Sequence, residues 1–387
     1  MIEKIKNLSA EYFDEIVKIR RHLHMYPELS FEEFGTSKYI KGILSSWGIE
    51  FTDGYVNTGI LVVLQGANPD SRILALRADF DALPIIEENN VEYCSKKQGI
   101  MHACGHDAHT ASMLGALKIL NEIKESWEGT IKFIFQPAEE RLPGGAKQMI
   151  EEGVLENPNV QNVIAQHVLP DLQVGKVGFK SGTYMASTDE IYIKIKGVGG
   201  HAAIPEKYNN PIIASSYLIL KLHQFFARHN DSIFAIGDVQ ANGSTNVIPK
   251  EVNLMGTFRA LSEEYRKESH QDIKDVIAEA EKEYDVDIDL EIRDGYPALH
   301  NDEELTKKNI SNAKDFLGKQ NVVNLPIRMT AEDFSYFANS VPSCFYRLGT
   351  GNKDKGITHG LHTSKFNIDE ESLKIGMGLM SYLAISS

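Results

Sequence analysis

The stretch Asp189–Gly197, DEIYIKIKG, decides how the middle of the chain folds. Its isoleucines alternate with polar residues, which is the period of a β-strand with one buried and one solvent-facing side. Five further elements follow with helix, strand, strand, helix and strand patterns: residues 211–228, 232–240 and 251–259, a helix that begins after Ser262, and residues 286–292. This β-α-β-β-α-β order predicts a ferredoxin-like α+β domain, an antiparallel sheet with helices on one face.

The sequence before this domain has a different pattern. Ile60–Gln65, Ile73–Ala78 and Ile131–Gln136 are short and apolar, which is typical of strands in a sheet that is covered on both faces. Helical patterns over Ser9–Met25 and His109–Lys124 accompany them. Strands separated by helices predict an α/β layer structure.

Length and pattern together predict two domains. A chain of 387 residues is too long for one ordinary core. The C-terminal stretch returns to mixed helix and strand signals, so the middle domain is inserted into the first. We expect an α/β domain made of residues 1–185 plus 299–387 and an inserted domain of residues 186–298.

Composition disfavours several classes of protein. The formal net charge of −14 disfavours nucleic acid or an anionic membrane surface as the main partner. No apolar segment approaches the length of a membrane span, and the amphipathic N-terminus lacks the apolar core of a signal peptide. The three cysteines are widely spaced and odd in number, which suits a reducing compartment. We therefore expect a cytoplasmic protein.

The segment Met101–His109, MHACGHDAH, is unusually rich in metal-binding side chains. It holds three histidines, a cysteine and an aspartate within nine residues. One buried cysteine alone is usually just a small apolar residue, and one histidine is usually structural. Five such side chains where a helix begins are better explained by a metal site, because imidazole and thiolate bind zinc and its neighbours in the first transition row.

Two adjacent carboxylates, Glu139 and Glu140, follow the strand Ile131–Gln136 in FQPAEERLPGG. Ligands of open α/β sheets bind at the C-terminal ends of strands. Neighbouring side chains of a non-helical segment point apart, so one carboxylate can hold a metal while the other faces the substrate. The spacing leaves open which residue has which role, and such a pair is also common on any acidic surface.

Further candidates end other apolar runs. Asp79 and Asp81 follow a strand in RADFDALP, where turn chemistry is the ordinary explanation. His167 ends the run in IAQHVLP, and His362 lies near the chain's end in HGLHTSKF. Taken singly, each is more often structural than catalytic.

Together these segments resemble the metal-dependent aminoacylase and amidohydrolase family of metallopeptidases. The subgroup with the most similar motifs contains hippurate hydrolases, auxin-conjugate hydrolases and N-acetyldiaminopimelate deacetylases. The ordered motifs run along almost the whole chain: RRHLHMYPELSFEE, RADFDALP, MHACGHDAH, FQPAEE, QHVLP, GVGGHAAIP, GTFR, MTAEDFSYF and LHTSKF. The resemblance implies a mixed-sheet, two-metal exopeptidase-like catalytic domain with an inserted ferredoxin-like lid and dimerisation domain.

The resemblance also assigns roles near the metals. It makes Glu139 the general base and Asp81 a support for the metal cluster. Five residues match the metal ligands: Cys104, His106, Glu140, His167 and His362. This set implies two divalent ions per chain. Unlike the wider family, the chain has Asp79 where a metal-binding histidine usually stands, and Cys104 near the position of a bridging aspartate. Manganese and zinc are the first candidates for the metal, with nickel and cobalt as further ones.

Three residues of the inserted domain match positions that relatives use for the substrate. His201, in GGHAAIP, corresponds to a histidine that polarises the scissile carbonyl, often from the partner subunit. Asn246 and Arg259 match substrate-contacting positions, and the guanidinium of Arg259 suits a carboxylate. The resemblance thus implies a homodimer, or a higher assembly, that acts on a small molecule.

The function implied is hydrolysis of an N-acyl amino acid by a two-metal amidohydrolase. Alternatives with the same chemistry are deacetylation of N-acetyldiaminopimelate in lysine synthesis and cleavage of a dipeptide. Two other classes are a metal-dependent binding or scaffold protein without turnover, and a cysteine hydrolase that uses Cys104 as its nucleophile. Retention of Glu139 with all five ligand positions argues against the first, and sensitivity to a chelator tests the second.

Overall fold

The computed structural model describes all residues from Met1 to Ser387 and divides into two compact units. Unit 1 comprises Met1–Gly182, His300–Pro326 and Asp333–Ser387, and unit 2 comprises Thr183–Leu299 and Ile327–Glu332. The segment Ile327–Glu332 corrects the expected domain bounds, which assigned it to the α/β domain. It lies in unit 2 because its backbone pairs with residues 184–186 through three hydrogen bonds of 2.9–3.2 Å.

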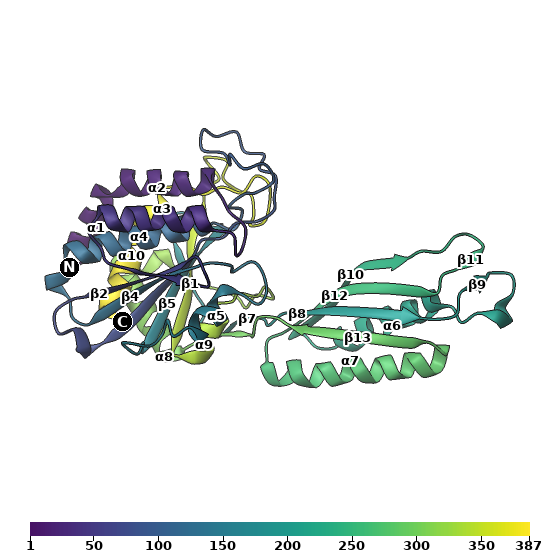
Figure 1. The fold of residues 1–387 in the computed structure, drawn as a ribbon. Helices are drawn as coiled ribbons and strands as arrows, with labels where there is room; N and C mark the ends of the chain where they lie inside the picture. The colour runs from purple at the N-terminus through teal and green to yellow at the C-terminus, as the bar shows by residue number, and fades with distance from the viewer. The chain divides into compact units, whose positions relative to one another are not determined.

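Unit 1 is built on a mixed eight-stranded sheet (Figure 1). The strand order is β1-β2-β4-β3-β5-β16-β6-β15. β3 pairs in parallel with β4 and β5, and β16 is parallel to β5, whereas β2 is antiparallel to β4. The strand bounds are β1 Thr52–Tyr55, β2 Gly59–Gln65, β3 Ile73–Asp79, β4 Thr130–Gln136, β5 Asn162–Gln173, β6 Val177–Phe179, β15 Val322–Asn324 and β16 Ser343–Gly351. The predicted mixed α/β sheet is confirmed.

Helices cover both faces of this sheet. The main core joins α4 and α10 to the sheet through side chains such as Leu76 and Phe133. Arg77, the next residue on β3, points to the other face and binds Asp333, just before α9. The predicted helix over Ser9–Met25 is divided into α1 and α2. The helix bounds are α1 Ile2–Glu11, α2 Phe13–Met25, α3 Phe34–Ser46, α4 His106–Glu122, α5 Gly145–Glu151, α8 Glu303–Leu317, α9 Ser335–Ser340 and α10 Ser372–Ser386.

Unit 2 has the predicted ferredoxin-like fold, an antiparallel sheet of order β10-β12-β8-β13 with α6 and α7 on one face. The alternating isoleucines of β8 are buried against these helices, and the intervening side chains are on the open face. Ser262 caps α7 as predicted, because its Oγ accepts a hydrogen bond from Tyr265 N (3.3 Å). The bounds are β8 Asp189–Lys196, α6 Pro211–Phe226, β10 Ser232–Ala241, β12 Glu251–Ala260, α7 Glu263–Tyr284 and β13 Asp287–Asp294.

The remaining short strands form a small sheet in unit 2 and the two connections between the units. Within unit 2, β9 (Gly200–His201) pairs with β11 (Val247–Ile248) as a small two-stranded sheet. The chain passes between the units in β7 (Gly182–Met185) and β14 (Leu299–Asn301). No helix of the structure combines the length and the apolar character that crossing a membrane requires.

Candidate metal centre

Parallel pairing brings the C-terminal ends of β3 and β4 level with the middle of β5 in unit 1. Asp79, the last residue of β3, is level with Gln136, the last residue of β4. On the other side, Arg77 pairs with Ala165 of β5, so His167 is level with Asp79. The register therefore places the polar residues that follow β3 and β4 beside His167, and α4 begins at the same edge.

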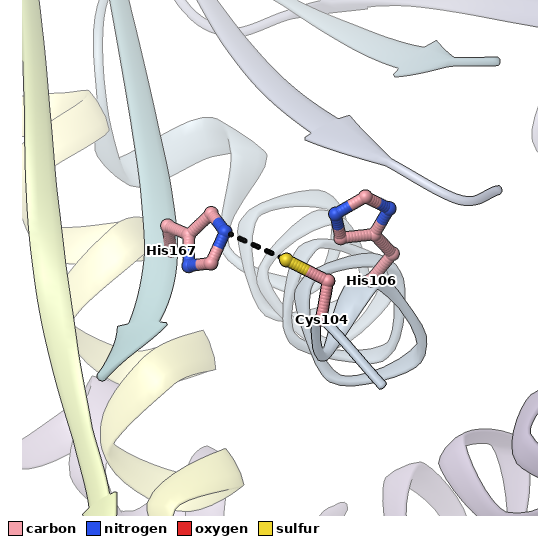
Figure 2. A group of neighbouring side chains, drawn as sticks. All are labelled: Cys104, His106 and His167. Atoms are coloured by element: carbon pink, nitrogen blue, oxygen red, sulfur yellow. Dashed lines mark hydrogen bonds between the residues drawn. The ribbon is translucent and has the colours of Figure 1, made fainter. Parts of the chain in front are cut away.

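A glycine shapes the turn that presents the first two ligand candidates. Gly105 separates Cys104 from His106 and has a φ of +85°. A Cβ on Gly105 would lie 2.4 Å from Cγ2 of Val168, so only glycine fits this backbone and this space. Cys104 therefore stays in the loop while His106 starts α4, and both side chains face His167 (Figure 2).

The candidate ligands form one contiguous cluster. Sγ of Cys104 lies 3.4 Å from Nε2 of His167 and 3.3 Å from Nε2 of His362. Oε1 of Glu140 lies 3.3 Å from Nε2 of His362 and 3.7 Å from Nε2 of His106. Two sets of three donors, Cys104–His106–His167 and Cys104–Glu140–His362, each lie within 4.8 Å of one another. The structure thus gathers all five residues that the resemblance named as ligands.

Glu139 lies outside the two sets around Cys104, but it forms a third set of close donors with His106 and Glu140. Its Oε2 is 3.9 Å from Nε2 of His106, and 6% of the residue is exposed. Glu139 and Glu140 both follow Ala138, whose φ of +55° turns the chain sharply after β4. The two carboxylates are adjacent in sequence, yet only Glu140 reaches His362 and Cys104.

Asp81 holds two members of the cluster in place. Its Oδ1 lies 3.1 Å from Nδ1 of His106, and its Oδ2 accepts hydrogen bonds from Ser30 Oγ (2.7 Å) and from the backbone N of Glu140 (3.0 Å). A carboxylate bound to one ring nitrogen of a histidine directs the other nitrogen toward a metal. Asp81 therefore orients His106 through Nδ1 and Glu140 through its backbone.

Unsatisfied buried atoms show that the cluster fits cations. Nε2 of His106 and Oε1 of Glu140 are buried and make no hydrogen bond. Burial opposes protonation of His106, but the carboxylates of Asp79, Asp81 and Glu140 outweigh it and raise the pKa of His106 to about 10. The metal-free cluster thus favours positive charge at this position, which a divalent ion would supply. Imidazole, thiolate and carboxylate are suitable donors for such ions.

The protonation of the other donors fits the same interpretation. Burial, with a smaller contribution from Arg347 and His109, keeps the pKa of His167 well below its usual value, so its imidazole is neutral. Nδ1 of His167 lies 2.8 Å from the carbonyl oxygen of Val168 and donates its hydrogen there, so Nε2 carries a free lone pair that faces Cys104. Burial and the carboxylates of Glu140, Glu139 and Asp79 raise the pKa of Cys104 far above its usual value. A thiol held neutral by its surroundings is a poor nucleophile.

The remaining potential ligands of MHACGHDAH do not join the two sets around Cys104, although His109 forms a separate set of close donors with Asp79 and His106. His109 binds Oδ1 of Asp79 through Nδ1 (2.6 Å) and accepts a hydrogen bond from Val168 N at Nε2 (2.9 Å). Asp107 lies 2.8 Å from Nε of Arg20 and 2.8 Å from Nδ1 of His24. His102 is buried, and both ring nitrogens lack a partner. Asp79 itself accepts hydrogen bonds from Arg77 and His109, so it is held beside the cluster and is not among the proposed ligands.

Three predicted site residues lie in unit 2. His201, on β9, is exposed, and its Nδ1 accepts a hydrogen bond from Ala203 N (3.1 Å). Asn246 is exposed, and its backbone carbonyl accepts a hydrogen bond from Ala202 N (3.0 Å), next to His201. Arg259, on β12, is half-buried, and its guanidinium makes no hydrogen bond or ion pair within the chain. Such a group is available to an anionic ligand.

The sequence interpretation missed the connecting residues. Ser30 and Glu33 belong to the motif RRHLHMYPELSFEE, which the resemblance contained but to which no role was given. Asp333, in MTAEDFSYF, accepts hydrogen bonds from Arg77, Gln136 and the backbone of Ala146. The only available signal was that these motifs match the family, because each contact joins segments that are far apart in sequence.

Comparisons with known proteins show similarity along almost the whole chain. N-acetyl-L-cysteine deacetylase of Bacillus subtilis is 37% identical over 93% of this chain and 85% of its own length. Thermostable carboxypeptidase 1 of Saccharolobus solfataricus is 35% identical over 100% of this chain and 98% of its own. The crystal structure of the YXEP protein of Bacillus subtilis, a dinuclear metal-binding peptidase, is 33% identical, has a TM-score of 0.83, and covers 97% of this chain and 98% of that chain.

The family itself is matched over most of the chain. Residues 75–386 match the peptidase family M20/M25/M40, and this range contains all ten predicted site residues. The dinuclear relative supports two divalent ions in the cluster of unit 1. The resemblance inferred from the motifs is confirmed: the chain belongs to the peptidase family M20/M25/M40 and is a hydrolase of amide bonds.

Proposed function

We propose that this enzyme removes the acyl group from an N-acyl amino acid, with Cys104, His106, Glu140, His167 and His362 holding two divalent ions. The observation that carries the proposal is the cluster of five close donors, of which Cys104, His106 and His167 are buried, with Glu139 beside it. Bound metal ions at such a site lower the pKa of water and polarise a carbonyl oxygen. Manganese or zinc is proposed as the metal, with nickel or cobalt as alternatives.

The chain's own residues would carry the proton transfers. Glu139 would accept a proton from the attacking water and deliver it to the leaving nitrogen, because a general base must lie beside the reacting centre. Asp81 would keep His106 and Glu140 oriented during the reaction. His201 would donate a hydrogen bond to the carbonyl oxygen, which gains negative charge in the transition state.

Polar groups of unit 2 support the choice of an amino-acid substrate. Arg259 has an unpaired guanidinium that suits an α-carboxylate, and Asn246 offers an amide near His201. Two relatives are named N-acetyl-L-cysteine deacetylase and thermostable carboxypeptidase 1, and both names indicate substrates that carry a carboxylate. N-acetyldiaminopimelate and dipeptides stay as alternative substrates with the same groups.

A panel of substrates tests this proposal. The metal-loaded enzyme should hydrolyse N-acyl amino acids, and amidation of the α-carboxylate should raise KM at least tenfold, because it removes the charge that pairs with Arg259. Arg259→Lys should show a similar rise in KM for the free acid only. Equal kcat/KM for acid and amide would remove the carboxylate from recognition, and dipeptides hydrolysed faster than every N-acyl amino acid would favour a peptidase.

We also propose that unit 2 pairs two copies of the chain. β10 is an edge strand of the sheet, and exposed edges need to be covered or paired. Exposed apolar side chains lie on α6 and β10: Ile213 and Leu220 are 53% and 59% exposed, and Val239 is 51% exposed.

The three unpaired cysteines agree with the cytoplasmic location proposed for the enzyme.

His201→Ala should lower kcat about 100- to 1000-fold, as loss of an oxyanion donor does, with metal content unchanged and a smaller effect on KM. If the partner subunit supplies this histidine, mixing inactive His201→Ala with inactive Glu139→Gln should restore activity through hybrid dimers. Static light scattering checks that dimers form, and co-purification of the untagged variant with a tagged one checks that they exchange subunits. An unchanged kcat in His201→Ala would exclude this residue from the mechanism, and a monomer would exclude the pairing.

A further inference from the structure

The residue before the two active-site glutamates is held in an unfavourable backbone conformation. Ala138 has a φ of +55°, in the left-handed region that costs an alanine about 1–2 kcal/mol. Such a conformation persists only where the surroundings hold it. Ala138 is fully buried, its carbonyl accepts a hydrogen bond from Gly145 N (2.9 Å), and its N donates to Oε1 of Glu33 (2.9 Å). Glu33 is the one side chain that holds the Ala138 amide.

Glu33 is placed for this contact and not for capping a helix. It directly precedes α3, yet its side chain makes no capping hydrogen bond to that helix. Its Oε1 also accepts from Phe31 N (2.9 Å), and its Oε2 accepts from Thr58 Oγ1 (3.1 Å). The residue is 0% exposed. One buried oxygen thus joins the backbone of Phe31 to that of Ala138.

Both backbone contacts lead to the candidate catalytic groups. Phe31, like Ala138, is left-handed, with a φ of +70°. Ser30, the residue before Phe31, donates to Oδ2 of Asp81, and Asp81 in turn accepts from the backbone of Glu140. The carboxyl of Glu33 therefore fixes two segments. One is the backbone just before Glu139, and the other is the backbone next to Ser30, which donates to Asp81.

We infer that Glu33 is a positioning residue for Glu139: it holds Ala138 in the left-handed conformation that directs the Glu139 carboxylate toward the reacting centre. The inference rests on the proposed role of Glu139 as base. Placement matters because a shift of about 1 Å in a catalytic group can cost about 100-fold in rate. Burial and the neighbouring Asp81 raise the pKa of Glu33 to about 7, in agreement with a group that acts through its hydrogen bonds more than through its charge.

The hydrogen bonds of Glu33 allow the length of its side chain to be tested separately from its charge. Both backbone donors bind the same oxygen, Oε1, so the carbonyl oxygen of a glutamine can accept both. The amide of that glutamine can donate to Thr58 Oγ1, since a hydroxyl accepts as well as donates. Aspartate keeps the charge, but it is one methylene shorter and loses the reach to Ala138. Methionine keeps approximate size and loses every hydrogen bond.

The experiment compares Glu33→Gln, Glu33→Asp and Glu33→Met in the metal-loaded full chain. We expect Glu33→Gln to keep kcat within about threefold, whereas Glu33→Asp and Glu33→Met lose about 10- to 100-fold in kcat with KM and metal content little changed. Hydrogen exchange of the Ala138 amide should be fast in the Asp and Met variants and slow in the Gln variant. Glu33→Asp keeps the test decisive if the Met variant does not fold.

A matched control separates positioning from general loosening of this region. Glu28 accepts hydrogen bonds from Thr36 N (2.7 Å) and Thr36 Oγ1 (3.0 Å) in the first turn of α3, but it does not touch Ala138. Glu28→Met should therefore leave kcat within about threefold. Aspartate outperforming glutamine at position 33, metal loss in Glu33→Met, or an equal loss of kcat in Glu28→Met would each overturn the inference.

The hydrogen-exchange measurement does not depend on turnover. It shows whether Glu33 holds the Ala138 amide even if Glu139 has another role. An active Glu139→Gln variant would refute the proposed role of Glu139 as base but would leave the hydrogen bond from the Ala138 amide to Glu33 untested by that result. Slow hydrogen exchange of the Ala138 amide in Glu33→Met would refute the inference alone.

Discussion

Glu139→Gln should lower kcat by about three orders of magnitude while the metal content stays near normal. Loss of a general base costs about 100- to 10,000-fold, because the attacking water then keeps its proton in the transition state. Glu139 belongs to neither donor set around Cys104, although its Oε2 lies 3.9 Å from Nε2 of His106 in a third set with Glu140. All five proposed ligands are still present in the Glu139→Gln variant. Stopped assays with elemental analysis of the same preparation measure both quantities.

Glu140→Gln provides the contrast within the same segment. Its Oε1 lies 3.3 Å from Nε2 of His362 and has no hydrogen-bond partner. Removal of its charge should therefore lower the metal content as well as kcat. Glu152→Gln, which changes an exposed carboxylate that binds Val56 N, is the control for charge alone. Similar metal loss in the variants of Glu139 and Glu140 would mean that the two roles have been wrongly divided.

Complete removal of metal should abolish activity, and addition of manganese, zinc, cobalt or nickel should restore it to different extents. Buried donors with unsatisfied atoms create a site that binds a cation and does little without one. Elemental analysis of the loaded protein should find about two divalent ions per chain, as expected for a two-metal hydrolase. Calorimetric titration of the stripped chain measures binding without reference to activity.

Cys104 decides between the metal site and thiol chemistry. Cys104→Ser should bind less metal, since a hydroxyl is a weaker ligand than a thiolate, and activity should fall with occupancy. Cys94→Ser is the matched control, because Cys94 is half-buried, donates to Asn89 O and belongs to none of the donor sets around Cys104. Full activity in a rigorously metal-free sample, together with its loss on alkylation of Cys104, would instead establish a cysteine hydrolase.

The contrast between strand patterns explains why the fold could be predicted from sequence. The alternation of DEIYIKIKG has the period of a half-exposed strand, and the continuous apolar run Ile131–Gln136 has the pattern of a fully buried one. β8 and β4 have these burial patterns in the structure. The segment Ile327–Glu332 was misplaced because its position depends on pairing with residues 184–186, far away in sequence.

The part of the candidate site that could be predicted from sequence is the part whose residues are close together in the chain. Cys104 and His106 are two residues apart around a glycine, and their residue types alone indicate a metal. Glu140, His167 and His362 were named through the family motifs, and the structure gathers them around Cys104. Their roles, like those of His201, Asn246 and Arg259, stay predictions until the variants are measured.

By itself the sequence determined the type and order of the elements, the two-domain plan and the chemical kinds of donor, because backbone period and residue chemistry are local properties. Only the tertiary structure decided that Asp81 holds both His106 and the backbone of Glu140, and that Glu33 holds Ala138 in its left-handed conformation. These contacts join segments separated by 25, 59 and 105 residues. Their geometry depends on how distant strands and loops of unit 1 pack together, and no local sequence pattern predicts this packing.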